Sequence, residues 1–349
     1  MVMPTRSKPS SRMANDLMSV ARVADTSPVY RRRYTAPMPG SVLLVAVVAA
    51  VLCPHEVVFV DIAKGAIVRT VELPGDGLAV FAAPDGRVVV PLAGDDSTSV
   101  VAVSGKMVHW PGRVFPMFFA DFDRMHAALP GMLATLSYPE RLLLVQTPLA
   151  GVVGVRRGAC SADGRLVALV PSGSGERTLL IVAAIEGGTL NRVRLAEEAR
   201  TVAVAPKGTF AVVASASGEV EVVTANQERS LGVIHLGGAA NAVVTTPDGR
   251  GALVGLARDQ GGEVVGVRVE LSAKQPLKER FRTSLAGAVI ALALTEDEVI
   301  AATNGGLVVL SAGGKKIRRE IVLAGARDVA ILSDRPKSSV PDWSDGTKP

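Results

Sequence analysis

Cysteine and aromatic residues are scarce in this chain. Aromatic residues make up 4% of its 349 residues, and its 2 cysteines, Cys53 and Cys160, lie far apart without a Cys-x-x-Cys pair. Two distant thiols cannot build a disulfide framework in a chain of this size, and the lack of Cys-x-x-Cys-His excludes covalent haem attachment. The cysteines therefore indicate a reducing compartment or small buried side chains.

Histidines and nucleophile motifs are also lacking. The 4 histidines show no His-x-His or His-Glu-x-x-His spacing, and no Gly-x-Ser-x-Gly motif occurs. Isolated histidines near strand ends are interpreted as surface or capped residues. The sequence therefore assigns no catalytic residue, no metal ligand and no cofactor. The histidines are His55, His109, His126 and His235.

No hydrophobic run is long enough to span a membrane as a helix. The longest, "SVLLVAVVAAVLC" at residues 41–53, is interrupted by His55 and Glu56, whereas a spanning helix needs about 20 apolar residues. Two interpretations stay open for this run. It is either a strand of the folded domain or a signal segment that would place the protein outside the cytoplasm.

Basic charge is concentrated at the N-terminus. Residues 1–40 carry seven basic and two acidic side chains, and the rest of the chain balances to zero. This pattern indicates a basic arm on a neutral body, and such arms contact acidic partners. The alternatives are a solvated tail or a later start codon at Met13 or Met38.

Two groups in the arm are candidate partner-binding residues. The first is Arg31, Arg32 and Arg33, which would bind an acidic protein or an anionic membrane surface. The second is Met13 and Leu17, which share one face if residues 13–24 form a helix. Nucleic acid is not the expected partner, because only two tyrosines interleave with the arginines.

The chain contains a repeat of strands and tight turns. Short runs rich in Val, Ala and Leu flank turns of the Pro-Asp-Gly-Arg type, which is a strong hairpin signal. The turns recur at 37 to 49 residues, about 41 on average, with about four strands per period, as in β-propeller blades. The turn residues are Asp85, Asp123, Asp163, Lys207, Asp248, Asp297 and Asp334.

The blade count predicts how the ring closes. Six units begin at residues 78, 115, 158, 201, 241 and 289, and residues 41–72 supply three further strands without a first one. Residues 326–334 match a first strand and then stop, so pairing them with the N-terminal strands would complete blade 1. The sequence therefore predicts an all-β, seven-bladed β-propeller over residues 41–334, between an arm (1–40) and a polar tail (335–349). The run at 41–53 becomes the second strand of blade 1.

Residues 57–94, "VVFVDIAKGAIVRTVELPGDGLAVFAAPDGRVVVPLAG", resemble the YVTN-type β-propeller repeat family, and looser copies cover residues 41–334. The Tyr-Val-Thr-Asn element itself is replaced, for example by "VVVPLAG". The resemblance implies a propeller. Many members of that family are binding or surface proteins without known chemistry, and related seven-bladed propellers include lactonases.

A second basic segment, "GKKIRRE" at residues 314–320, is expected on the last hairpin of blade 7, next to blade 1 and the arm. Its basic residues are Lys315, Lys316, Arg318 and Arg319. They are candidates for binding the same acidic partner, and the alternative is that they blunt an exposed edge strand.

The function favoured by the sequence is a non-enzymatic binding platform, an accessory or scaffold subunit of a larger protein assembly. It is expected in the cytoplasm, with peripheral membrane association as a variant, and exported if residues 41–53 are a signal. The competing hypothesis is a lactonase-like enzyme with its site at the central channel mouth. Alanine and valine on many inner strands disfavour that hypothesis, but three or more convergent polar side chains at one mouth would weaken the scaffold hypothesis.

Overall fold

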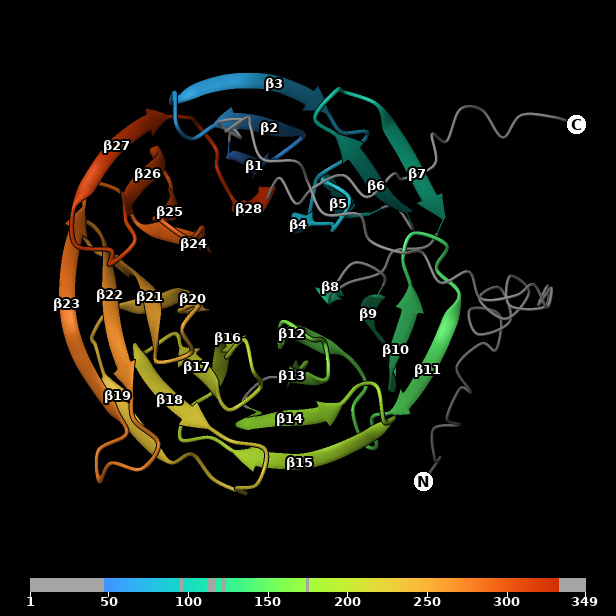
Figure 1. Ribbon diagram of the computed structural model, residues 1–349, viewed down its shortest axis with the longest axis vertical. Coiled ribbons are helices and arrows are strands. Elements are labelled where there is room, and N and C mark those ends of the chain that lie inside the picture. The colour runs from blue at the N-terminus through green and yellow to red at the C-terminus, as the bar shows by residue number, and fades with distance from the viewer. Residues whose placement is uncertain (1–46, 95–96, 112–116, 121–123, 174–175, 333–349) are drawn as a thin grey trace, which may run out of the picture.

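The computed structural model describes residues 47–332 except 95–96, 112–116, 121–123 and 174–175. The predicted arm and tail lie outside the described residues, so the roles of Met13, Leu17, Arg31, Arg32 and Arg33 stay predictions. The described chain forms seven four-stranded antiparallel sheets arranged as blades around a central axis (Figure 1). This architecture confirms the predicted seven-bladed β-propeller. No helix in this part of the chain is long and apolar enough to cross a membrane.

The blades are numbered from the N-terminus. Within each blade the strands are named in order from the innermost, next to the axis, to the outermost. Blade 1 contains β28 (Asp328–Leu332), β1 (Val48–Cys53), β2 (Glu56–Asp61) and β3 (Ala66–Glu72). Blade 2 contains β4 (Phe81–Ala82), β5 (Arg87–Pro91), β6 (Ser97–Ala102) and β7 (Met107–Pro111). Blade 3 contains β8 (Met117–Ala120), β9 (Arg124–Leu129), β10 (Met132–Ser137) and β11 (Leu143–Pro148).

The other four blades follow the same order. Blade 4 contains β12 (Val155–Cys160), β13 (Leu166–Pro171), β14 (Thr178–Ala183) and β15 (Gly188–Arg194). Blade 5 contains β16 (Ala199–Val204), β17 (Ala211–Ser215), β18 (Glu219–Val223) and β19 (Gly232–His235). Blade 6 contains β20 (Ala239–Thr245), β21 (Gly251–Arg258), β22 (Gly261–Val269) and β23 (Leu277–Leu285). Blade 7 contains β24 (Val289–Leu294), β25 (Glu298–Thr303), β26 (Gly306–Ser311) and β27 (Ile317–Val322).

The hydrophobic core is divided among the interfaces between blades. Each of the seven buried clusters joins two neighbouring blades, and together they cover all seven interfaces. A middle strand is buried on both faces, because a blade packs on either side of it. This explains why these strands are continuous runs of Val, Ala and Leu rather than alternating sequences.

The opening run of the domain shows this division residue by residue. Ala49, Val51 and Cys53 of β1 pack against blade 7. Ala50 and Leu52 pack against blade 2, as expected from the two-residue period of a strand. These five residues are at most 1% exposed. Residues 48–53 are therefore a central strand of blade 1, as the blade count predicts, and residues 41–46 lie outside the described residues.

The ring closes through β28. This strand pairs antiparallel with β1, from Val48 opposite Leu332 to Leu52 opposite Asp328. Blade 1 thus combines one C-terminal strand with three N-terminal strands, as predicted from residues 326–334, and β1 is covered on both edges (Figure 1).

The turn between β17 and β18 provides a stability prediction. Gly218 has a φ of +83°, and a Cβ added there would lie 2.3 Å from the carbonyl oxygen of Gly238. A backbone atom cannot move aside cheaply, so Gly218→Ala should lower the free energy of unfolding by about 3 kcal/mol. Gly86→Ala is the matched control, because Gly86 has a φ of +80° with nothing within 4 Å of the added Cβ. It should cost only about 1 kcal/mol. Equal losses in urea unfolding would contradict the steric explanation.

Candidate functional site at the channel mouth

The inner strands of blades 4 to 7 each carry a β-bulge near their first residue. In β12 the pairing passes from Val155 to Arg157, so that Arg156 is the extra residue, and β16, β20 and β24 repeat this shift. A bulge redirects the side chain of its extra residue. The bulge residues are Arg156, Arg200, Asn241 and Ile290.

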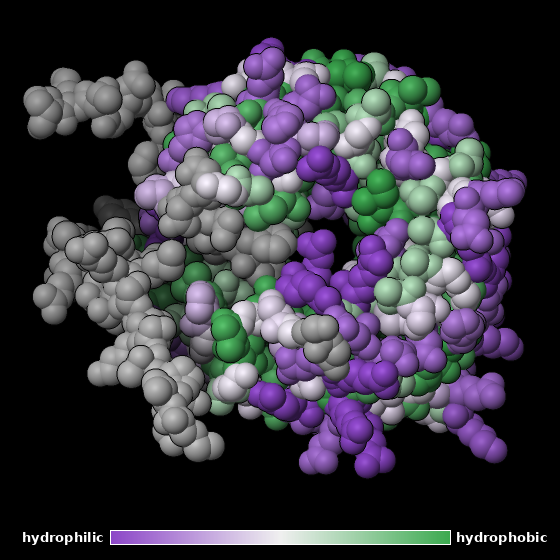
Figure 2. Space-filling view, turned by 180° about the vertical axis from the view of Figure 1, so that it is seen from behind, coloured by the Kyte–Doolittle hydropathy of each residue, from purple (hydrophilic) through white to green (hydrophobic). Residues whose placement is uncertain are grey.

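These residues occupy one position of the repeat, seven residues before the turn residue. Arg327 and Leu78 hold that position in blades 1 and 2. Pro116 holds it in blade 3 and lies outside the described residues. The fold thus assigns one residue per blade to the start of the inner strand, and hydrophilic side chains gather around much of a central opening (Figure 2).

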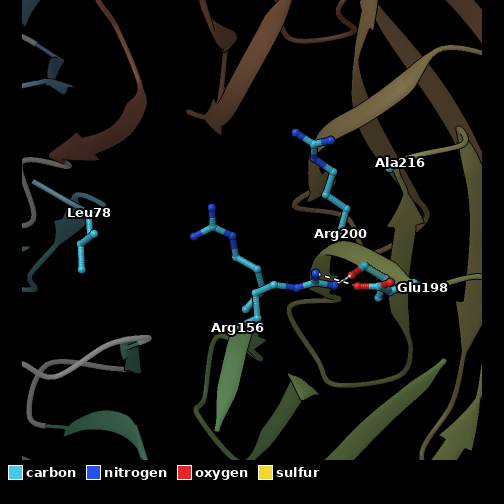
Figure 3. A pocket seen from close by; sticks show the side chains of 7 residues that line it. Leu78, Arg156, Glu198, Arg200 and Ala216 are labelled. Atoms are coloured by element: carbon cyan, nitrogen blue, oxygen red, sulfur yellow. Dashed lines mark hydrogen bonds and ion pairs between the residues drawn. The ribbon is translucent and has the colours of Figure 1, made fainter. Parts of the chain in front are cut away.

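A cavity of about 520 Å³ opens at this mouth. Leu78 of blade 2 lies across an open space from Arg156 and Arg200, which come from blades 4 and 5 (Figure 3). The cavity therefore lies across the channel and not between two neighbouring blades. The lining residues are Leu78, Arg156, Arg157, Glu198, Ala199, Arg200 and Ala216.

Arg156 is held in place by blade 5. Its Nη1 is 2.8 Å from Oε1 of Glu198, and its Nη2 donates a hydrogen bond to the carbonyl oxygen of Ala199. The guanidinium thus joins two blades, and its charge is matched by the carboxylate of Glu198 (Figure 3).

Arg200 differs from Arg156 in this respect. It is exposed, and it has no hydrogen-bond or ion-pair partner among residues 47–332 as far as they are described. Its guanidinium extends away from Glu198 into the open space (Figure 3). The cavity lining as a whole carries three cations and one carboxylate, so the mouth has an excess of positive charge.

Asp328 of β28 lies on the blade 1 side of this mouth. Its Oδ2 accepts a hydrogen bond from the backbone N–H of Val80 at 3.0 Å, and its Oδ1 accepts one from Val329 at 2.9 Å. Burial raises the pKa of Asp328, and the charge of Arg157 acts in the opposite direction. The two side chains therefore interact electrostatically at the mouth, and Asp328 also ties blade 1 to blade 2.

Because alanine and valine dominate the inner strands, the mouth was expected to lack convergent polar side chains, and this expectation is wrong. Four charged side chains line the cavity, more than the three convergent polar side chains that would weaken the scaffold hypothesis. Arg156 and Arg200 were not singled out, because each is an isolated arginine one repeat away from the other. Alignment of the repeats on their turn residues is the signal that identifies them.

The basic segment 314–320 is brought next to blade 1, but its side chains separate. Arg318 pairs with Glu298 at 3.2 Å, and Lys315 lies over the ring of Phe281 at 5.9 Å. Lys316 is exposed. Arg319 donates hydrogen bonds to the carbonyl oxygens of Ile62 and Ala63 in the β2–β3 turn of blade 1.

This segment and the arginine mouth lie on opposite faces of the ring. In blade 1 the mouth is at the end where Leu52 pairs with Asp328. The β2–β3 turn that Arg319 contacts is at the other end, where Val48 pairs with Leu332 and with Asp61. The described chain also begins and ends at that second face. A partner bound there would leave the mouth open.

The turn aspartates, His126 and Cys53 are the other residues that could carry chemistry, and each has a structural role. Asp85, Asp163 and Asp248 each accept a backbone hydrogen bond within their own turn, at 3.0 to 3.1 Å. His126 is 0% exposed in the middle of β9, so its interpretation as a surface or capped residue is wrong. Burial raises the pKa of the Cys53 thiol to about 11, which keeps it protonated at neutral pH. Within the described ranges no group of three or more His, Cys, Asp or Glu side chains could hold a metal ion.

Three solved structures resemble this chain in fold. One is hydrazine synthase of Kuenenia stuttgartiensis, with 15% identity, a TM-score of 0.60, and coverage of 75% of this chain and 90% of that chain. Another is U3-55K, with 11% identity, a TM-score of 0.62, and coverage of 82% and 91%. The third is a functionally unknown protein from Desulfotomaculum acetoxidans, with 15% identity, a TM-score of 0.66, and coverage of 82% and 98%.

At such identities the likeness supports the propeller fold alone, and fold does not determine function. No protein-family model and no curated protein sequence matches the chain.

Proposed function

We propose that this propeller is a non-enzymatic binding protein that holds an anionic group at the mouth of its central channel. The proposal rests on the cavity in which Arg156, Arg157 and Arg200 converge against one carboxylate. Guanidinium groups stay charged at all physiological pH values, and their planar donors match carboxylate and phosphate oxygens.

Acid–base chemistry is less well supported at this mouth. A lactonase-like enzyme remains the competing proposal, because charged side chains converge there. Hydrolysis requires a positioned base or an activated water. The carboxylate in the cavity lining, Glu198, is 2.8 Å from Arg156 and is already used in an ion pair. The arrangement is thus better suited to binding an anion than to removing a proton.

The proposed role in the cell is that of an accessory or scaffold subunit in the cytoplasm, with peripheral membrane association as a variant and export as the alternative. The resemblance to YVTN-type repeats supports a binding role. The basic composition of residues 1–40 supports an acidic protein or anionic membrane as the second partner. Val47, from which these residues extend, adjoins the face opposite the mouth and accepts a hydrogen bond from Ile62 at 2.9 Å.

Replacement of Arg200 tests the anion site. Arg200→Gln should weaken the binding of inorganic phosphate by about tenfold, because one charged hydrogen-bond partner is lost. The measurement is isothermal titration at low salt and at one fixed pH, because phosphate itself changes charge near neutral pH whereas the guanidinium does not titrate there.

Arg250→Gln is the matched control, because Arg250 is an exposed arginine beside the β20–β21 turn, on the face opposite the mouth. Its phosphate affinity should equal that of the wild type. Equal losses in the two variants would indicate nonspecific attraction to a cationic protein and would count against a site at the mouth.

A further inference from the structure

The cavity at the mouth has two chemically different walls. Arg156, Arg157 and Arg200 line the cavity on the side of blades 4 and 5. Leu78 of blade 2 lies across the open space from Arg156 and Arg200 (Figure 3). Leu78 is 39% exposed although it is a large apolar side chain. It occupies the repeat position that is arginine in blades 1, 4 and 5, so blade 2 presents an apolar side chain to the cavity, at the position where those blades carry a cation.

Accepting the proposed function, we infer that the ligand is a small amphipathic organic anion. Its anionic group lies at Arg200, and its apolar part lies against Leu78. An apolar wall opposite a cationic one adds affinity only for a molecule that carries both kinds of surface.

The size of the cavity supports a small organic molecule. Its volume of about 520 Å³ falls within the range of about 300 to 1,000 Å³ for small-molecule sites. An inorganic anion would fill only a fraction of it and would leave Leu78 in water. The cavity also lies inside the ring, where blades 2, 4 and 5 bound it, so a compact ligand fits it better than an acidic peptide lying over the rim.

Arg156 and Glu198 set the position of the anionic group. Both guanidinium ends of Arg156 are engaged by blade 5, and the carboxylate of Glu198 repels a second anion beside it. Arg200 has no such partner among the described residues. The anion is therefore directed toward Arg200, which places the rest of the molecule over the open space toward Leu78.

Three related probes distinguish the contributions of the cationic and the apolar side of the cavity to binding. Octanoate carries both surfaces, acetate carries the anionic group alone, and octan-1-ol carries the apolar chain alone. In wild-type full-length protein, octanoate should bind at least about tenfold more tightly than acetate, because several methylene groups leave water. It should also bind at least about tenfold more tightly than octan-1-ol, because the alcohol lacks the charge that pairs with a guanidinium group. The measurement is isothermal titration calorimetry at one ionic strength.

Variants of Leu78 and Arg200 test which residue binds the apolar part of the ligand and which binds its anionic group. Leu78→Ser should reduce the octanoate affinity to within about threefold of that of acetate, and Leu78→Gln, which keeps the bulk of the side chain, should do the same. Arg200→Gln should weaken octanoate and acetate by one common factor. Leu144→Ser is the control, because Leu144 is 52% exposed on the outer strand β11, and it should change nothing. Circular dichroism verifies that each variant is folded.

The possible failures are distinguishable. Equal affinities for octanoate and acetate, both reduced by Arg200→Gln, would overturn the amphipathic ligand and leave the anion site intact. Binding that does not respond to Arg200→Gln would overturn the proposed function as well. A hexaglutamate peptide that binds more tightly than octanoate, without any effect of Leu78→Ser, would identify a macromolecular partner and reject the small ligand.

Discussion

A chain that ends at Gly325, and so lacks β28, is expected to lose at least about 4 kcal/mol of unfolding free energy and to aggregate. Two physical effects add up. Val329, Ala330 and Leu332 are each less than 10% exposed, and their burial against blades 1, 2 and 7 is lost. The inner edge of β1 would also be unpaired, and an open apolar edge recruits other chains. Urea unfolding followed by circular dichroism measures the first effect, and size-exclusion chromatography measures the second.

The matched control is a chain that ends at Asp334. It removes the predicted tail, residues 335–349, and keeps β28. Its urea midpoint should match that of the full chain. If the two truncated chains unfold at the same midpoint, the closing strand does not contribute the expected stability.

The second large effect concerns His126, which lies in β9 at the interface with blade 4. Its Nδ1 is 2.9 Å from Oγ1 of Thr135, and that hydroxyl donates its hydrogen to the carbonyl oxygen of Ala184 at 3.0 Å. The hydroxyl must therefore accept a hydrogen bond from Nδ1–H. Nε2 is buried without a hydrogen-bond partner in the described part of the chain. Protonation of the ring would place a charge in this buried interface, where the backbone of Gly164 offsets only part of the cost of burial.

Stability should therefore fall in mild acid. Burial lowers the pKa of His126 to about 4, whereas the pKa of a histidine in an unfolded chain is about 6.5. Between these values the unfolded chain binds a proton that the folded chain does not. The contribution of His126 to the free energy of unfolding is fully present above about pH 6.5. It declines by about 3 kcal/mol as the pH falls to about 4, and it is constant below that pH. Urea unfolding at intervals from pH 7.5 to pH 4 measures this slope.

His126→Asn separates this effect from the titration of carboxylates. The amide nitrogen of asparagine can still donate to Thr135, but the side chain does not titrate. The variant starts from a lower stability, because a buried ring is lost, and its pH dependence should be shallower by about 3 kcal/mol over the same range. Parallel curves for the two proteins would contradict the assignment to His126.

The basic segment at residues 314–320 shows where reasoning from the sequence stops. Closeness in the sequence groups Lys315, Lys316, Arg318 and Arg319 as one surface. In the structure, a bulge in β27 leaves Arg318 as an extra residue without its own partner on β26. Arg318 pairs with Glu298 in its own blade, and Arg319 reaches blade 1. Whether these side chains form one surface depends on the direction in which each of them points. The composition of the segment does not give these directions.

His126 was missed for a related reason. Its two neighbours, Met125 and Ala127, are buried and pack against blade 2. His126 points to the other face, which blade 4 covers, so it too is buried. In an ordinary half-exposed sheet a polar residue at this position would face water. Only the stacking of blades on both sides of the sheet removes that option.

The sequence by itself determined the propeller, its seven blades and its closing strand. A tight turn is a local property of a few residues, and its regular spacing sets the length of a blade, so these features follow without knowledge of distant contacts. The tertiary structure decided that Arg156 and Arg200 line one cavity at the channel mouth. Arg156 and Arg200 belong to different blades, and they converge because a bulge redirects each side chain and because the closed ring brings the starts of all inner strands together.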